Sequence, residues 1–149
     1  MLFGLFGCDY LAEKKLKPGE STVQEVERLM GEPTMRWDEP DGTRLLEYSR
    51  MPNGTHNYML RISSAGILVS MEQTLDEAHF DRVATGMTED QVRRLLGQPA
   101  TRQPLPLKNQ LVWDWPYVGP ANQEMRFNVH FGPEGKVVET SRTMVQTSG

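Results

Sequence analysis

Apolar positions recur at helical spacing within residues 86–99, and signals at both ends complete a short helix. Thr88 stands where an N-cap belongs, and Gln91 three positions later forms a capping box with it. Gly97 can adopt the left-handed conformation that ends a helix, and Pro99 prevents the helix from resuming. The apolar stripe of this predicted helix consists of Val92, Leu95 and Leu96.

The same signals for the start and the end of a helix occur earlier, in residues 19–33. Thr22 is the expected cap and Glu25 its capping-box partner, while Gly31 and Pro33 end the helix. Both segments have an N-cap, an apolar stripe and a glycine and proline that end the helix, and a strand-like region follows each segment. This combination predicts an internal repeat. The alternative is that these are two ordinary capped helices. The positions that match at one constant offset are Val26, Arg28, Leu29, Gly31 and Pro33 with Val92, Arg94, Leu95, Gly97 and Pro99.

Alternation of apolar and polar residues follows the first helix and predicts antiparallel strands. Residues 34–50 predict a strand, a turn and a second strand, with Pro40-Asp41-Gly42 as the turn. Two more strands carry their apolar residues at alternate positions. These residues are Tyr58, Leu60 and Ile62, then Ile67, Val69 and Met71.

The second copy begins with a further helix, predicted over residues 74–84 from a capping box between Thr74 and Glu77. Together with the next helix it predicts a helical hairpin. Residues 99–106 contain three prolines and predict an extended loop. Strands follow at the alternating residues Leu111, Trp113, Trp115 and Tyr117, then Met125, Phe127, Val129 and Phe131, and last from Val137.

These patterns predict an α+β fold of two tandem repeats, each a helix or helical hairpin followed by a three- to four-stranded antiparallel sheet. The expected boundaries are residues 9–73 for the first repeat and 74–143 for the second, with a frayed tail at 144–149. The chain has 149 residues, 16 basic and 20 acidic, with one cysteine. This balance does not indicate nucleic-acid binding, and one cysteine allows no internal disulfide. No apolar run is long enough to cross a membrane as a helix.

The single cysteine ends an apolar segment, residues 1–8. Leu5-Phe6-Gly7-Cys8 is similar to a bacterial lipobox, with leucine at minus three and a small residue before the cysteine. Only seven residues precede Cys8 and none is basic, so we expect that the true start lies upstream or that the chain is trimmed. The predicted modification is lipidation of Cys8; the alternative is a buried small apolar cysteine.

Four aromatic residues are candidates for partner binding, because aromatic side chains are enriched at binding hot spots. Trp113, Trp115 and Tyr117 share one face of a predicted strand, and Trp37 precedes an acidic turn. The alternative is that they pack in the core. His56, His79 and His130 fall on separate elements without a metal-ligating motif, so we expect no metal, no cofactor and no catalytic site.

Several of these motifs together resemble the SmpA/OmlA (BamE-like) family of bacterial lipoproteins. They are the Gly86-Met-Thr opening, the Leu96-Gly-Gln-Pro99 stop, Trp113-Asp-Trp115, and Phe127 to Phe131 before a turn glycine. The resemblance covers about residues 74–143, and the first copy matches more loosely. It implies a lipid-anchored protein on the periplasmic side of the outer membrane, with an envelope protein as partner and the β-barrel assembly machinery as the expected candidate.

The prediction for function is a non-enzymatic periplasmic lipoprotein that serves as an interaction module in outer-membrane protein assembly or envelope integrity. Asp9 directly after the cysteine leaves the inner membrane open as the target. A tandem of this fold also resembles the β-lactamase inhibitory proteins, so an inhibitor-like binder of a periplasmic enzyme is one alternative. It requires an exposed concave sheet rich in aromatic residues. A small periplasmic enzyme is the other, and it requires a pocket with convergent titratable groups.

Overall fold

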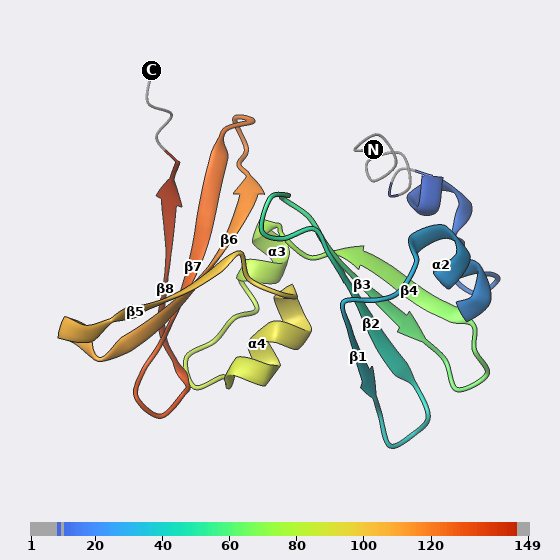
Figure 1. Cartoon of the computed structure of the whole chain (residues 1–149), viewed down its shortest axis with the longest axis horizontal. Coiled ribbons are helices and arrows are strands. Elements are labelled where there is room, and N and C mark those ends of the chain that lie inside the picture. The colour runs from blue at the N-terminus through green and yellow to red at the C-terminus, as the bar shows by residue number, and fades with distance from the viewer. Residues whose placement is uncertain (1–8, 10, 146–149) are drawn as a thin grey trace. The chain divides into compact units, whose positions relative to one another are not determined.

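The computed structural model describes residues 9 and 11–145 and divides into two compact units, each with its own sheet (Figure 1). The first unit takes in the described residues up to Ser49 and those of Tyr58–Glu72. The second takes in Arg50–Asn57 and the described residues from Gln73 onward. Each unit carries a four-stranded antiparallel sheet, in the orders β1-β2-β3-β4 and β5-β6-β7-β8. The predicted α+β class is confirmed.

The first unit is built around helix α2, Val23–Met30. Thr22 caps it as predicted, because its Oγ1 accepts a hydrogen bond from the backbone N–H of Glu25. The helix ends at Gly31, whose φ of 78° is one that glycine adopts without a Cβ penalty. The strands are β1 Met35–Asp38, β2 Arg44–Ser49, β3 Asn57–Ile62 and β4 Leu68–Gln73.

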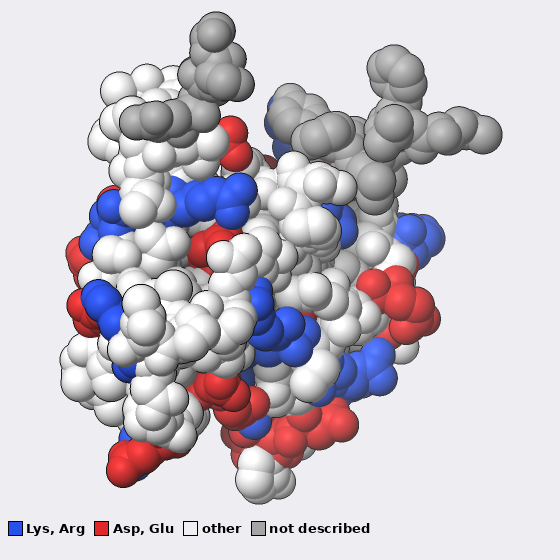
Figure 2. All heavy atoms as spheres, turned by 60° about the vertical axis from the view of Figure 1, so that its left-hand side comes forward, with Lys and Arg blue, Asp and Glu red and all other residues white. Residues whose placement is uncertain are grey.

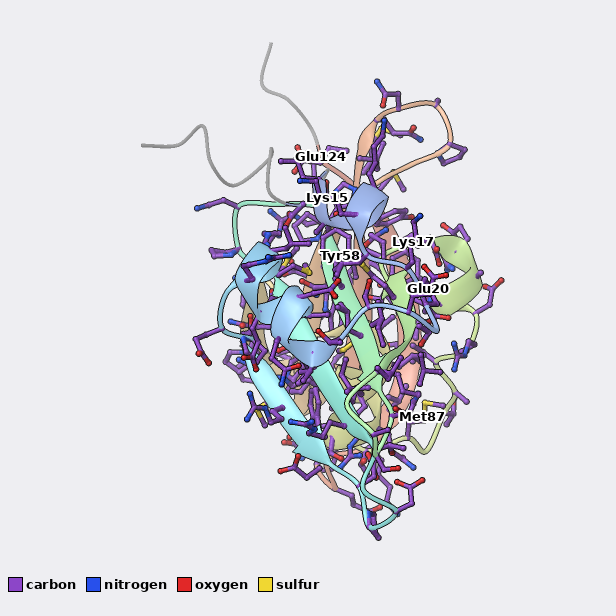
Figure 3. All side chains as sticks on the ribbon, turned by 90° about the vertical axis from the view of Figure 1, so that its right-hand side faces the viewer. Lys15, Lys17, Glu20, Tyr58, Met87 and Glu124 are labelled. Atoms are coloured by element: carbon purple, nitrogen blue, oxygen red, sulfur yellow. The ribbon has the colours of Figure 1, made fainter. Side chains whose placement is uncertain are left out.

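The core of the first unit lies between α2 and one face of its sheet. A lead-in segment, helical over residues 11–15, adds Ala12 and Leu16 to this core. Figure 3 labels Lys15 and Lys17 on this part of the chain, and Tyr58 of β3 belongs to the same core as Ala12 and Leu16. The other buried members of this core are Val23, Val26, Met30, Leu46, Tyr48, Leu60, Ile62 and Leu68.

The second unit has two short helices on one face of its sheet, α3 Glu77–Phe80 and α4 Glu89–Leu96. Thr88 and Gln91 form the predicted capping box of α4, and the helix ends at Gly97 with φ 89°. The remaining elements are β5 Thr101–Leu105, the 3-10 helix η1 Pro106–Lys108, β6 Gln110–Val118, β7 Glu124–Phe131 and β8 Val137–Met144.

Aromatic side chains fill the core of the second unit. Phe80 of α3 stacks on Phe127 with ring centroids 4.2 Å apart, and meets Tyr117 edge to face at 4.8 Å. The alternation predicted for β6 and β7 is confirmed, since one face of each strand is buried. The buried members are Leu75, Phe80, Val92, Leu96, Trp113, Trp115, Tyr117, Phe127, Val129, Phe131 and Val137.

Two predictions of secondary structure are wrong. The helix expected over residues 74–84 is only the single turn α3, and Asp76 caps it by accepting from the N–H of His79. Thr74 does not cap a helix, because its hydroxyl donates instead to the carbonyl of Leu96 at 2.7 Å. The loop expected over residues 99–106 contains strand β5. A proline is tolerated there because β5 is an edge strand, where a missing N–H breaks no necessary ladder bond.

Candidate functional site

The structure places the four candidate aromatic residues in cores. Trp113, Trp115 and Tyr117 are 5%, 0% and 2% exposed and belong to the core of the second unit. Trp37 is 6% exposed and forms a separate small cluster with Leu45 and Met59. Their placement is the core alternative that the sequence left open. Cys8, the candidate lipidation site, lies outside the described residues.

The β5–β8 sheet presents a second face, on the side opposite to its aromatic core. Because side chains alternate along a strand, the strand register assigns every second residue to this face. We call it the polar face. Its residues are Thr101, Gln103, Leu105, Gln110, Val112, Asp114, Pro116, Val118, Glu124, Arg126, Asn128, His130, Glu139, Ser141 and Thr143, of which Leu105, Val112, Pro116 and Val118 are apolar.

Asp114 is the centre of one hydrogen-bonded group on the polar face. It accepts a hydrogen bond from Arg126 Nη1 at 2.7 Å and a short one from the hydroxyl of Thr101. The side chain of Asp114 is only 14% exposed, so this ion pair is partly shielded from water. Three strands therefore fix one charged group in place, because Thr101, Asp114 and Arg126 belong to β5, β6 and β7.

His130 is the centre of a second group. Its ring nitrogens lie 3.1 Å from Gln110 Oε1 and 3.2 Å from Ser141 Oγ, and Glu139 Oε1 lies 3.5 Å away. Asn128 Nδ2 donates to the same Ser141 hydroxyl at 3.2 Å. These polar side chains satisfy one another across β6, β7 and β8. The side chains of the polar face are consequently fixed by one another, and order of this kind lowers the entropy cost of binding.

Charges of both signs are distributed over this side of the second unit. Figure 2 shows lysine and arginine side chains beside aspartate and glutamate, among many uncharged residues. Within the described part of the chain, no group of three His, Cys, Asp or Glu residues is placed to hold a metal ion. A shallow hollow beside the β5–β6 turn is lined by uncharged residues only, namely Pro104, Leu105, Pro106, Asn109, Gln110, Leu111, Gly132 and Pro133.

An ion pair fastens α3 to the edge of the same sheet. Arg142 of β8 donates two hydrogen bonds to Glu77 Oε2, at 2.7 Å from Nη2 and 3.1 Å from Nε, and Tyr117 Oη donates to Oε1 at 3.2 Å. The hydrogen bonds from Arg142 hold the pKa of Glu77 below its ordinary value. Burial raises the pKa of Tyr117, and the Glu77 carboxylate raises it further. Both shifts have the direction expected where an ionised carboxylate contacts a guanidinium group and a neutral phenol hydroxyl.

A buried polar network holds the end of α4. Asn57 Nδ2 donates to the carbonyls of Leu96 and Gln98, at 2.9 and 3.0 Å. The Thr74 hydroxyl donates to the same Leu96 oxygen, and Trp115 Nε1 donates to the carbonyl of Gly97 at 3.1 Å. Asn57 is fully buried, although the sequence places it beside a turn and gives no signal of this role. The network is structural, since its donors are directed at backbone carbonyls.

One family model and three solved structures match the chain. Residues 73–140 match the outer membrane protein assembly factor BamE domain, which confirms the predicted resemblance in this region. A crystal structure of the osmotically inducible lipoprotein OsmE is 25% identical over 46% of this chain and 72% of that one, with a TM-score of 0.41. A comparison with curated proteins gave no match.

Two more distant structures match most of the chain. A DUF4309 family protein (YjgB) from Bacillus subtilis is 13% identical over 89% of this chain and 84% of its own, with a TM-score of 0.35. A protein from Streptococcus mutans described as a β-lactamase inhibitor protein is 10% identical over 91% of this chain and 95% of its own, with a TM-score of 0.36.

Proposed function

We propose that this chain, whose residues 73–140 match the BamE domain, is a non-enzymatic envelope lipoprotein that binds protein partners during outer-membrane protein assembly. The family match is the observation that carries the proposal. The geometry is compatible with it, because Glu77 with Arg142 and Asp114 with Arg126 form ion pairs that join elements of the second unit, and His130 is held by Gln110, Ser141 and Glu139. The inhibitor alternative required exposed aromatic residues, and their burial weakens it.

We propose the polar face as the surface that meets the partner. Its side chains are held by hydrogen bonds across four strands, and its charges include both signs. A face of this kind favours a partner surface of mixed charge, where complementary placement sets orientation and specificity. The β-barrel assembly machinery is the candidate partner, because the matching domain model is named for an assembly factor.

We further propose that Cys8 carries the lipid anchor. The Leu5-Phe-Gly-Cys8 pattern supports this role, and more than one acyl chain at a single residue is enough for stable anchoring. In the part of the chain that the structure describes, no helix has the length and hydropathy needed to cross a bilayer. The periplasmic side of the outer membrane is the proposed location, with the inner membrane as the alternative because of Asp9.

We propose that the two units are tandem copies of one plan, with residues 9–73 and 74–143 as the repeats. Matching contacts support this. The carbonyl of the helix-ending glycine accepts from an aromatic side chain in both units, from Tyr48 at Gly31 and from Trp115 at Gly97. The chain ahead of each helix also pairs with the last strand, through Gly19 with Leu68 and Gly86 with Val137.

The anchor is tested by intact mass and membrane fractionation of protein expressed from the full upstream reading frame. We expect a mass increase equal to diacylglycerol plus an acyl chain, and recovery in the membrane fraction. Both should be lost in Cys8→Ala. An unmodified and freely soluble wild-type protein would contradict the anchor.

The partner is tested by affinity purification from detergent-solubilised membranes, with the subunits of the β-barrel assembly machinery measured by quantitative mass spectrometry. We expect Gln103→Arg with Asn128→Arg, both on the polar face, to reduce their recovery at least tenfold. Gln24→Arg with Asn53→Arg, two exposed positions outside the polar face, adds the same charge as a matched control and should leave recovery unchanged. Failure of the wild-type chain to recover any subunit would overturn the proposed role.

A further inference from the structure

Strand β8 forms one edge of the β5–β8 sheet, and among the described residues no strand pairs with its outer side. It contains eight residues, and every one after Val137 is at least partly exposed to solvent. The other edge, β5, has five residues and includes Pro104, which has no N–H to offer. Proline and short length are devices that protect an edge from further pairing, and β8 has neither.

The backbone groups on the open side of β8 can be identified. The N–H of Val145 donates to the carbonyl of Glu124 at the end of β7. In an antiparallel pair, alternate residues of a strand direct both backbone groups to the same neighbour. Thr143 and Ser141 therefore also face β7. The residues that direct their N–H and C=O groups away from the sheet are Thr140, Arg142 and Met144.

This open side is regular over the length that a partner strand needs. The one irregularity between β7 and β8 lies at His130 and Phe131, before the stretch that begins at Thr140. From there to Met144, each residue pairs with β7 in continuous register. Six backbone groups, three donors and three acceptors, are thus presented at the spacing of an ordinary β-ladder.

We propose that β8 binds an extended segment of another protein as a fifth strand of this sheet. The main-chain groups specify an occupant in strand conformation, and the exposed Met144 favours an apolar neighbour at one position of that strand. Met144 is 63% exposed, so an apolar residue beside it would cover that surface. On the opposite face, Glu139, Ser141 and Thr143 favour polar neighbours. The occupant is a strand that alternates apolar and polar residues, as the strands of outer-membrane β-barrels do.

The identification of the bound strand as part of an outer-membrane β-barrel rests on the proposed function. The proposal that β8 binds a strand does not. The experiment uses the full chain with Cys8→Ala and a synthetic peptide, acetyl-Lys-Val-Thr-Val-Thr-Val-Thr-Val-Lys-amide. Amide hydrogen exchange is measured by NMR with and without saturating peptide. We expect exchange at Thr140, Arg142 and Met144 to slow at least tenfold, with little change at Ser141 and Thr143, which already bond to β7. The same peptide N-methylated at alternate residues should give no protection.

A substitution at Thr140 distinguishes an effect on peptide binding at β8 from an effect on the stability of the sheet. Thr140→Pro removes an outward N–H and leaves the ladder to β7 intact, so peptide affinity should fall at least tenfold with little change in the urea midpoint. Thr140→Ala keeps the N–H and should bind within twofold of wild type. If Thr140→Pro does not fold, the N-methylated peptide gives the same test on the wild-type chain.

The outcomes distinguish this proposal from the proposed function. Peptide protection confined to β8, in a chain that recovers no assembly subunit, would uphold the edge and count against the function. Recovery of subunits without slower amide exchange at Thr140, Arg142 and Met144 would overturn only the proposal that β8 binds a strand. Protection at β5 in place of β8 would also overturn it.

Discussion

The two units end their principal helices in the same way but surround that end differently. Gly31 and Gly97 both have positive φ, and each carbonyl accepts from an aromatic donor of the sheet. Around Gly31 nothing lies within 4 Å of the position that a Cβ would take. At Gly97 that position is 2.7 Å from the side chain of Asn57. The same local signal therefore forms an open cap in the first unit and part of a buried network in the second.

The units also differ in what is packed beside the helix. The first unit adds a lead-in segment through the apolar side chains of Ala12 and Leu16. The second adds α3, which is held by Phe80 in the core and by the Glu77–Arg142 ion pair. The comparison teaches that a shared helix-and-sheet plan tolerates different additions. The family model matches the unit that has the ion-paired helix.

Alanine at the two helix-ending glycines should show the largest difference. Gly31→Ala forces a residue with a Cβ into a glycine conformation, at a cost of about 1–3 kcal/mol. Gly97→Ala carries the same cost and also displaces Asn57, which adds roughly 1–3 kcal/mol for disrupted buried hydrogen bonds. Urea unfolding followed by tryptophan fluorescence measures both. Equal losses would contradict the contrast between an open and an enclosed cap.

Removal of one donor from each unit should give the next largest contrast. Asn57→Ala deletes hydrogen bonds to Leu96 and Gln98 in a buried site and should cost about 2–4 kcal/mol. Tyr48→Phe deletes one bond to the exposed Gly31, where water can replace it, and should cost about 0.5–1.5 kcal/mol. Denaturation midpoints of the two variants decide the order.

The N-caps should give nearly equal effects, because here the two units are alike. Thr22→Ala and Thr88→Ala each remove a side-chain acceptor for the first turn and should cost about 1 kcal/mol. Gln91→Ala removes only the reciprocal bond to the Thr88 N–H and should cost less than Thr88→Ala. Thermal unfolding of the three variants provides the measurement. A Thr22→Ala variant as stable as the wild type would contradict the expected similarity of the two caps.

The smallest expected effect is a loss of stability at acidic pH. The folded pKa of Glu77 lies below its ordinary value of 4.5, so the ion pair stabilises the second unit above that pH. This stability is lost as the pH falls through the lowered pKa. Because the Glu77 side chain is 51% exposed, the contribution is at most about 1 kcal/mol. In Glu77→Gln, the free energy of unfolding should depend less steeply on pH in the acidic range. An unchanged dependence would contradict the role given to the Glu77–Arg142 ion pair.

Local signals were sufficient for the elements that both units share. Caps at Thr22 and Thr88 and stops at Gly31 and Gly97 depend on residues within one turn, and the structure has all of them. The predictions failed where distant contacts decide. Thr74 bonds to Leu96 instead of capping a helix, and β5 pairs with β6 despite its proline.

The candidate site was less predictable for the same reason. Asn57 reaches a carbonyl 39 residues away, and Arg142 reaches a carboxylate 65 residues away. No spacing in the sequence marks such pairs. Alternation placed Trp113 and Trp115 on one face of a strand, but only the packing of α3 and α4 decides that this face is core. The polar face on the opposite side follows from the register.

The claim that the two units are copies of one plan is tested most directly by a helix graft. Residues 88–99 are replaced by residues 22–33, which keeps a cap, an apolar stripe, a glycine and a proline at matching positions. The account predicts a cooperative second unit that loses no more than about 3 kcal/mol, since Leu96→Met is a mild core change. A control graft of residues 23–34, shifted by one position, should unfold it. If the in-register and shifted grafts destabilise the second unit equally, the two helices are not equivalent and the tandem account is wrong.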